Sequence, residues 1–135
     1  MKAIVSRYKL NKMLLWCVYK YGMTEQQDDY PEFILHRSQQ YMLKRYIPPN
    51  PEDLFFIKKI KGEYDYSDNT IHIYSWANKD LEDFCQTMIH EYQHYLEKDQ
   101  DSEVINNRKS VRLDKLAETI AQKDYLECLK HLGYR

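Results

Sequence analysis

The residues whose types and spacing are best suited to catalysis form the motif His90-Glu91-Tyr92-Gln93-His94. In a helix, histidines at these two positions lie one turn apart on the same face. Two neutral imidazoles in this arrangement can bind one Zn²⁺ at about 2.0–2.1 Å each. Glu91 would project from a neighbouring face, close enough to hold a water at the metal and to take its proton. The motif therefore predicts a hydrolytic zinc site.

A chance origin is the main alternative for this motif. The chain has five histidines, and about one random chain in a hundred of this composition would contain His-Glu-x-x-His. The motif would then be a solvated helix face that carries two histidines and binds no metal. The motif alone leaves both interpretations open.

Local signals place the motif on a helix. Asn78 is the expected N-cap, and acidic residues follow in the first turn, where they interact favourably with the helix dipole. Apolar residues recur at helical spacing on one face, whereas His90 and His94 fall on the opposite side. The helix is thus expected to turn its back to the core and both histidines to a cleft or to water. The apolar face comprises Leu81, Phe84, Cys85, Met88, Ile89, Tyr92, Tyr95 and Leu96.

A catalytic zinc site needs a third protein ligand besides the two histidines. Glu118 is the preferred candidate, because it follows His94 at a separation that allows a loop and a returning antiparallel helix. Asp114, one turn earlier, is its rival, and His131 in the last turn of the final helix has no motif around it. The alternative for Glu118 is an exposed helix residue that touches no metal. Small neighbours that would let its helix pack closely are Ala117 and Ala121.

Two further helices follow from apolar periodicity. One is expected over residues 7–21, closed by Gly22, and a last long helix over residues 109–132, ending at Gly133. The polar residues 98–110 are expected to form a loop or a loosely helical connector.

The strand signals are shorter. Phe33-Ile34-Leu35 predicts a short buried strand, with a helical turn as the alternative. Residues 62–66 and 70–74 alternate around the turn residues 67–69, which predicts a β-hairpin. His72 in the second strand is expected on a polar, exposed face rather than at a metal.

The stretch between these strands is ambiguous. Residues 38–47 fit a helix, and prolines then break any regular element. Asn50 and Pro51 resemble the cap and first position of another helix. Residues 54–60 could continue that helix or form a strand.

Composition limits the possible classes of protein. The 135 residues suit a single domain over residues 1–135, and helices combined with a hairpin predict an α+β fold. With a net charge of −1, the protein has no overall positive field that would attract nucleic acid or acidic membranes. The three cysteines are far apart and suggest buried, reduced thiols rather than disulfides. With no apolar segment typical of a signal or an anchor, the protein is expected in the cytoplasm. The sequence does not indicate an oligomeric state.

The part of the chain from Gly62 to Leu132 resembles the gluzincin metallopeptidases. It is most similar to the compact single-domain minigluzincins and to the ImmA/IrrE-type metallopeptidases of phages and mobile elements. The matching features are a Gly-x-Tyr hairpin, His-Glu-x-x-His and the Glu-x-x-Ala run that begins at Glu118. The resemblance implies a zincin-like fold with an edge hairpin on the active-site helix and a C-terminal helix that carries the glutamate. It also suggests a phage or mobile-element origin.

The same resemblance implies roles for individual residues. His90, His94 and Glu118 would hold Zn²⁺, Glu91 would be the general base, and strand 70–75 would be the sheet edge that receives a peptide or protein substrate. Many gluzincins carry Asp four residues after the glutamate ligand, where it supports a zinc-bound histidine. In this chain Gln122 takes that position.

The expected reaction is peptide hydrolysis, with Glu91 moving a proton from the attacking water to the leaving amine. Tyr125, two turns past Glu118, is the expected donor to the developing oxyanion, with His131 and Tyr134 as alternatives. A zinc endopeptidase is the first functional hypothesis. The second is a catalytically weak or latent zinc-binding regulatory protein, and the third is a structural protein whose motif is accidental.

Overall fold

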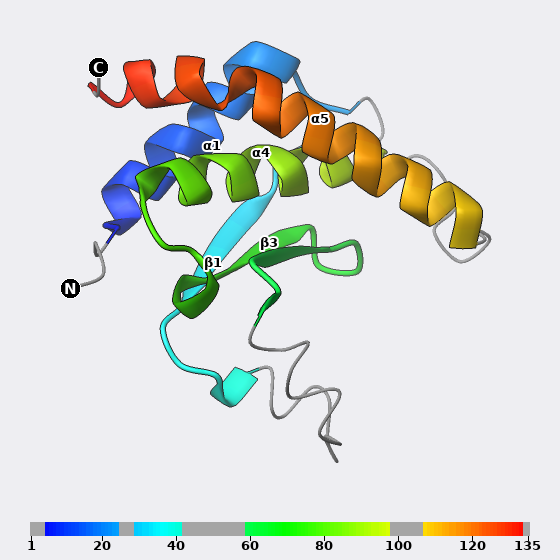
Figure 1. Cartoon of the computed structure of the whole chain (residues 1–135), viewed down its shortest axis with the longest axis horizontal. Coiled ribbons are helices and arrows are strands. Elements are labelled where there is room, and N and C mark those ends of the chain that lie inside the picture. The colour runs from blue at the N-terminus through cyan, green and yellow to red at the C-terminus, as the bar shows by residue number, and fades with distance from the viewer. Residues whose placement is uncertain (1–4, 25–28, 42–58, 98–106, 134–135) are drawn as a thin grey trace.

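The computed structural model of the chain describes residues 5–24, 29–41, 59–97 and 107–133, with side chains from residue 113 onward in the last range. Within these ranges three α-helices pack on one face of a three-stranded mixed sheet (Figure 1). The predicted α+β class is thereby confirmed. The elements are α1 (Arg7–Tyr21), β1 (Glu32–His36), β2 (Gly62–Asp65), β3 (Thr70–Tyr74), the short 3-10 helix η1 (Ser75–Ala77), α4 (Leu81–Leu96) and α5 (Asn107–His131).

Helix α1 has the bounds that its sequence predicts. The Ser6 hydroxyl accepts a hydrogen bond from the Lys9 amide at 3.1 Å, which caps the first turn. Gly22 ends the helix with a φ of 78°, a conformation that costs glycine little, and its amide donates to the Val18 carbonyl. The buried face of α1 consists of Leu10, Met13, Leu14, Trp16 and Cys17.

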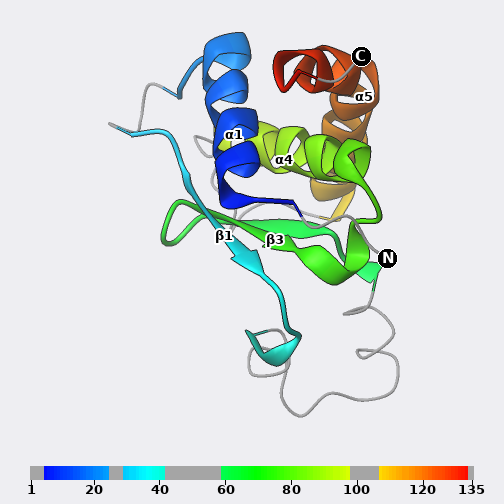
Figure 2. The same cartoon turned by 90° about the vertical axis from the view of Figure 1, so that its left-hand side faces the viewer.

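The sheet has the order β1-β3-β2, so β3 is the central strand (Figure 2). β2 pairs with β3 in antiparallel fashion, which confirms the predicted hairpin. β1 pairs with the other side of β3 in parallel, with Glu32 opposite Thr70 and His36 opposite Tyr74. The expectation that strand 70–75 forms a sheet edge is therefore wrong, because a distant strand occupies its second side. The edge next to α4 is β2.

The hairpin turns at residues 66–69, where Asn69 adopts a φ of 54°. Asparagine tolerates this left-handed conformation. The Asp65 carboxylate accepts hydrogen bonds from the amide and the hydroxyl of Ser67, at 2.9 and 2.7 Å. These contacts set the turn that the sequence predicts.

His72 is not exposed, contrary to the expectation for a polar strand face. Its exposed fraction is 2%. Its Nδ1 lies 2.8 Å from His36 Nε2, and its ring stacks on His36 and on Tyr41. The face of the sheet opposite the helices is thus covered by aromatic rings, which local alternation in the sequence does not reveal.

Residues 32–36 form a strand, as predicted, but this strand is only partly buried. Leu35 is buried, whereas Ile34 is 44% exposed. A strand at the edge of a sheet packs one face on the core and leaves the other accessible. The expectation of a wholly buried strand is therefore corrected.

Helix α4 is the element on which the rest of the domain packs. It contacts α1, α5, β2 and β3. Its N-cap is Asp80, whose carboxylate accepts from the Asp83 amide at 2.9 Å, and not Asn78 as expected. Asn78 is instead buried, and its side-chain amide donates to the carbonyl oxygens of Tyr74 and Lys61.

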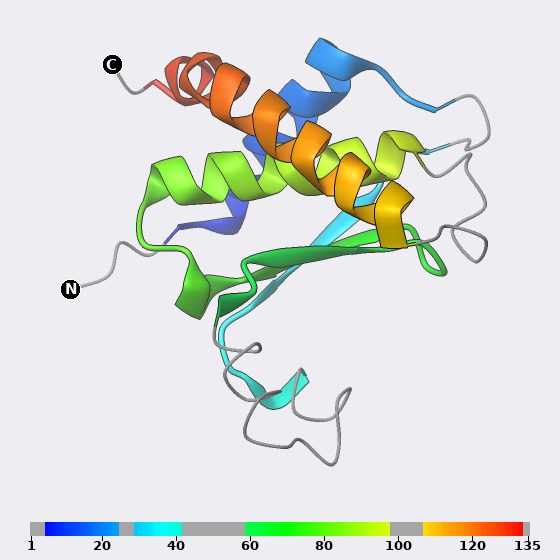
Figure 3. The same ribbon diagram turned by 45° about the vertical axis from the view of Figure 1, so that its right-hand side comes forward.

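Helix α5 crosses α4 along much of its length (Figure 3). Ala117 and Ala121 are buried at 2% and 0% exposure, which fits the predicted close packing of the two helices. The helix ends before Gly133, which has a φ of 92°. The three cysteines, Cys17, Cys85 and Cys128, are buried and unpaired, as expected.

Several sequence predictions lie outside the described residues. They concern most of the ambiguous stretch 38–60, namely residues 42–58, and residues 98–106 of the expected connector. Among the residues that are described, no helix has the length and apolar character needed to cross a membrane.

Candidate metal centre

The two motif histidines meet on the face of α4 that points away from the core. Their rings are 5.1 Å apart between centroids, and their Nε2 atoms are 3.3 Å apart. Both side chains are partly buried, at 20% and 26% exposure. Two imidazole nitrogens this close cannot both point a proton at each other. The pair therefore favours either one shared proton or one cation between the rings.

Asp114 brings a carboxylate from α5 to this histidine pair. Its Oδ1 lies 2.8 Å from His94 Nε2 and 3.4 Å from His90 Nε2. Ligand atoms around a tetrahedral Zn²⁺ stand about 3.3 Å from one another. The three separations of 2.8, 3.3 and 3.4 Å therefore resemble one face of such a tetrahedron. The residues present fit a zinc ion.

Glu118 approaches the other side of His90. Its Oε2 lies 3.2 Å from His90 Nδ1. A carboxylate only accepts, so Nδ1–H is the donor and the Nε2 lone pair remains for a metal. This position is that of a residue that orients a ligand, and the structure brings Asp114 rather than Glu118 to the two Nε2 atoms. The role of Glu118 as a direct ligand stays a prediction.

Gln122 connects Glu118 to α4. Its amide Nε2 donates to Glu118 Oε1 at 2.9 Å and to Gln86 Oε1 at 3.1 Å. The chain of contacts thus runs from Gln86 through Gln122 and Glu118 to His90. Gln122 thus positions the carboxylate that meets the histidine.

Burial sets the protonation of the groups around the site. Desolvation lowers the pKa of His94, and the nearby His90 adds to this shift, while the Asp114 carboxylate opposes it. The neutral imidazole, which is the form that binds a metal, is therefore favoured.

Glu91 lies beside the histidine pair with an exposed fraction of 7%. Desolvation is the largest cause that raises the pKa of its carboxyl to about 8; the Asp114 and Glu63 charges contribute to the same shift, and a backbone hydrogen bond from Tyr64 opposes it. A dication nearby would favour the ionised form again. The predicted base is thus beside the candidate ligands and in contact with β2.

Strand β2 passes very close to α4 at Gly62. A Cβ atom at this position would lie 2.7 Å from Thr87 Cγ2, 3.0 Å from the His72 carbonyl oxygen and 3.3 Å from Glu91 Cγ. Only glycine permits this approach of the strand to the helix. The close packing of β2 on α4 therefore explains why the first position of the Gly-x-Tyr hairpin is a glycine.

Asn78 and Thr87 fasten α4 to the hairpin. The Thr87 hydroxyl donates to Asn78 Oδ1 at 2.7 Å. The Asn78 amide donates to the carbonyl oxygens of Tyr74 and Lys61, at 2.8 and 3.2 Å. All three contacts are made next to the site, so they fix the distance between the motif helix and β2. Sequence reasoning missed this role, because an asparagine before a helix is an ordinary cap signal.

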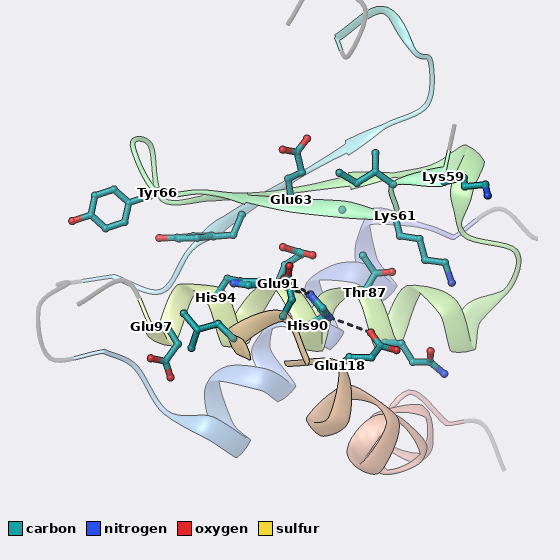
Figure 4. A pocket seen from close by; sticks show the side chains of 16 residues that line it. Lys59, Lys61, Glu63, Tyr66, Thr87, His90, Glu91, His94, Glu97 and Glu118 are labelled. Atoms are coloured by element: carbon teal, nitrogen blue, oxygen red, sulfur yellow. Dashed lines mark hydrogen bonds and ion pairs between the residues drawn. The ribbon is translucent and has the colours of Figure 1, made fainter. Parts of the chain in front are cut away.

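The candidate site opens into a pocket of about 630 Å³ between β2, α4 and α5 (Figure 4). The side chains of His90, Glu91 and His94 point into the space between the hairpin and α4. A pocket of this size is in the range that holds a peptide segment or a small ligand.

The donors expected for an oxyanion are not gathered here. Tyr125 is half-buried against the hydrophobic core, and neither Tyr125 nor His131 lines the pocket. Tyr134 lies outside the described residues. Two other tyrosines, Tyr64 and Tyr66, do line the pocket, and the Tyr64 hydroxyl donates to Asn69 Oδ1 at 2.6 Å.

A second group of ligand-type atoms lies near the hairpin turn. Asp65, Asp68 and His72 have ligand atoms within 4.8 Å of one another. Asp65 Oδ1 already accepts two hydrogen bonds from Ser67, and His72 Nδ1 contacts His36. The group is therefore a less suitable metal site than the histidine pair with Asp114.

Comparisons of the chain with protein-family models, with curated proteins and with solved structures found no match.

Proposed function

We propose that this protein is a zinc-dependent metallopeptidase in which His90, His94 and Asp114 hold the metal. The observation that carries the proposal is the convergence of two Nε2 atoms and one carboxylate oxygen at separations of 2.8 to 3.4 Å. Glu118 is assigned the role of orienting His90 through Nδ1, as carboxylates commonly do for metal-bound histidines. Asp114 and Glu118 lie one helical turn apart, so α5 presents both to α4.

Kinship with the gluzincins is part of the proposal. The chain order of hairpin, motif helix and returning helix supports it, because the resemblance implies the same order. The chain would depart from the usual pattern in having an aspartate as third ligand and a glutamate as the supporting carboxylate. The buried, unpaired thiols fit a reducing compartment, so we place the reaction in the cytoplasm.

Zn²⁺, when bound, supplies Lewis-acid chemistry that polarises a peptide carbonyl and makes water more acidic. Glu91 takes a proton from the water whose oxygen attacks the carbonyl carbon. It then delivers that proton to the amine nitrogen as the C–N bond breaks. Its burial next to His90 excludes bulk water from this transfer.

Strand β2 is the proposed binding edge for an extended substrate. The Tyr74 amide donates to the Lys61 carbonyl at 3.0 Å, and hydrogen-bonded positions alternate along an antiparallel pair. The N–H and C=O groups of Gly62 and the C=O group of Tyr64 are therefore directed away from β3, toward the pocket, while the Tyr64 amide donates to the Glu91 carboxylate. A peptide can pair with such an edge through its own backbone. This assignment replaces strand 70–75.

The second hypothesis, a catalytically weak zinc-binding regulatory protein, is favoured by one observation. Tyr125, the expected oxyanion donor, packs in the core. Of the two tyrosines that line the pocket, Tyr64 donates its hydroxyl to Asn69. Stabilisation of the negative charge in the transition state would then depend on the metal and on Tyr66. Loss of one oxyanion donor lowers kcat by about 10²–10³-fold.

Hydrolysis of a quenched peptide library by the zinc-loaded protein tests the two hypotheses. A metallopeptidase should cleave peptides, lose activity with a chelator, and lose it in Glu91→Gln while zinc remains bound. The regulatory alternative predicts zinc and peptide binding without turnover. Full activity of Glu91→Gln would contradict the role of Glu91.

A further inference from the structure

The two ends of the pocket differ in charge. Lys59 and Lys61 line the end next to the start of α4, and Tyr66 and Glu97 line the end next to its last turn (Figure 4). The candidate metal ligands lie between these ends. A peptide extended along β2 would therefore experience opposite fields on the two sides of the reacting bond.

The basic end is built from the residues that precede β2. Lys61 Nζ lies 3.4 Å from Asp83 Oδ1, and its side chain is 47% exposed. An ammonium group has three donor hydrogens, so this long contact leaves capacity for a second carboxylate. The backbone of Lys61 is fixed, because its carbonyl accepts from Tyr74 and Asn78.

The acidic end is built around the C-cap of α4. Glu97 is that cap, and its side chain lines the pocket. Tyr66, which is 47% exposed, provides an aromatic surface on the same side.

The dipole of α4 has the same direction as this charge difference. The N-terminus of a helix is partly positive and its C-terminus partly negative. The positive end of α4 lies at Lys61 through its contact with Asp83, and the negative end lies at Glu97. Side chains and helix dipole therefore have the same direction along the pocket, and the acidic residues of the first turn, Glu82 and Asp83, reduce the positive field at its Lys61 end.

We propose that the pocket selects extended peptides with opposite charges on the two sides of the cleaved bond. Such a peptide carries a basic side chain or its free amino terminus on the N-terminal side of that bond, and an acidic side chain or its free carboxyl terminus on the C-terminal side. The proposal rests on the proposed function and specifies its substrate class. The direction follows from antiparallel pairing with β2, which is the more stable arrangement of two strands. β2 runs from the Lys61 end to the Tyr66 end, so an antiparallel peptide has its C-terminal half beside the lysines.

Two peptides of equal composition test this direction. One carries lysines before a central apolar pair and aspartates after it, and the other has the two charged halves exchanged. We expect the first peptide to be cleaved with a kcat/KM about fivefold higher or more, and this preference to shrink at high salt. Binding of both peptides to zinc-loaded Glu91→Gln, measured by fluorescence anisotropy, should show the same order.

Charge reversals locate the preference in the pocket. Lys61→Glu and Lys59→Glu should each reduce it, and Glu97→Lys should reduce it from the other side. Lys79→Glu is the matched control, because Lys79 is exposed and does not line the pocket. Lys59→Glu keeps the test valid if the loss of the Lys61 contact with Asp83 impairs folding.

The outcomes separate the two proposals. Unequal binding in the expected order without cleavage would support the charge selection and contradict the peptidase function. Cleavage of both peptides at equal rates, the opposite preference, or binding of neither peptide would overturn the charge selection.

Discussion

His94 Nε2 lies 2.8 Å from Asp114 Oδ1, although 20 positions of sequence separate the two residues. The contact joins the end of α4 to the early part of α5. Because Ala117 and Ala121 let the two helices approach closely, the carboxylate is positioned by helix packing and not only by the segment that connects them. The proposed metal centre depends on this relationship.

Removing the Thr87 hydroxyl should separate the hairpin from the motif helix. Thr87 and Asn78 are 4% and 1% exposed, and Thr87→Val would leave the side-chain oxygen Oδ1 of Asn78 without its donor. We expect the free energy of unfolding to fall by about 1–3 kcal/mol, measured by urea denaturation. Thr119→Val is the matched control, since its hydroxyl is exposed and donates to the Lys115 carbonyl of its own helix. Equal losses in both variants would contradict the role of Thr87.

Gly62→Ala should be destabilising despite its small size. The new methyl group would lie 2.7 Å from Thr87 Cγ2 and 3.0 Å from the His72 carbonyl, and the Thr87 side chain is held by Asn78. Overpacking of this kind costs about 1–3 kcal/mol. Adding Thr87→Ser removes the clashing methyl and keeps the hydroxyl, so the double variant should recover part of the loss in thermal or urea unfolding. A Gly62→Ala variant as stable as wild type would show that β2 does not sit this close to α4.

The His36–His72 pair should make stability depend on pH. Burial lowers the pKa of His36, and His72 lowers it further. Below the ordinary histidine pKa of about 6.5 the unfolded chain therefore binds more protons than the folded one. The contribution of neutral His36 to the free energy of unfolding is therefore fully present above about pH 6.5. It is lost as the pH falls from there toward the lowered pKa of His36 in the folded protein.

His36→Phe removes the titrating group and keeps a ring that can stack on Tyr41 and Tyr74. Other groups that face the pair are Tyr41 and, through the Tyr74 hydroxyl, Glu63. Between about pH 7.5 and pH 5.5 the variant should lose less unfolding free energy than wild type. An unchanged pH dependence in urea denaturation would rule out His36 as its source.

Local features of the structure could be predicted from the sequence. Helix α1 follows from its apolar spacing and Gly22, and the hairpin follows from alternation around a turn that ends at Asn69. The motif helix and α5 follow from periodicity in the same way. These signals involve neighbours within a few residues, so no distant contact is needed to interpret them.

Features that depend on distant pairing could not be predicted. β3 is central only because β1 pairs beside it, and His72 is buried only because His36 and Tyr41 stack on it. For the third ligand of the proposed metal centre, the sequence indicates both Asp114 and Glu118 on one face of a helix. The choice between them depends on how α5 crosses α4, which residue spacing alone does not determine.

Zinc content of the purified full-length protein tests the central claim most directly. It would be measured by mass spectrometry after dialysis, with affinities from chelator competition, in wild type, Asp114→Asn, Glu118→Gln and the control Glu127→Gln, which lies on α5 and pairs with Lys20. We predict about one zinc per chain in wild type and in the control. Asp114→Asn should lose the metal, and Glu118→Gln should keep it with an affinity about 10–100-fold lower. A wild-type protein without zinc, or loss of zinc in Glu118→Gln but not in Asp114→Asn, would contradict the account.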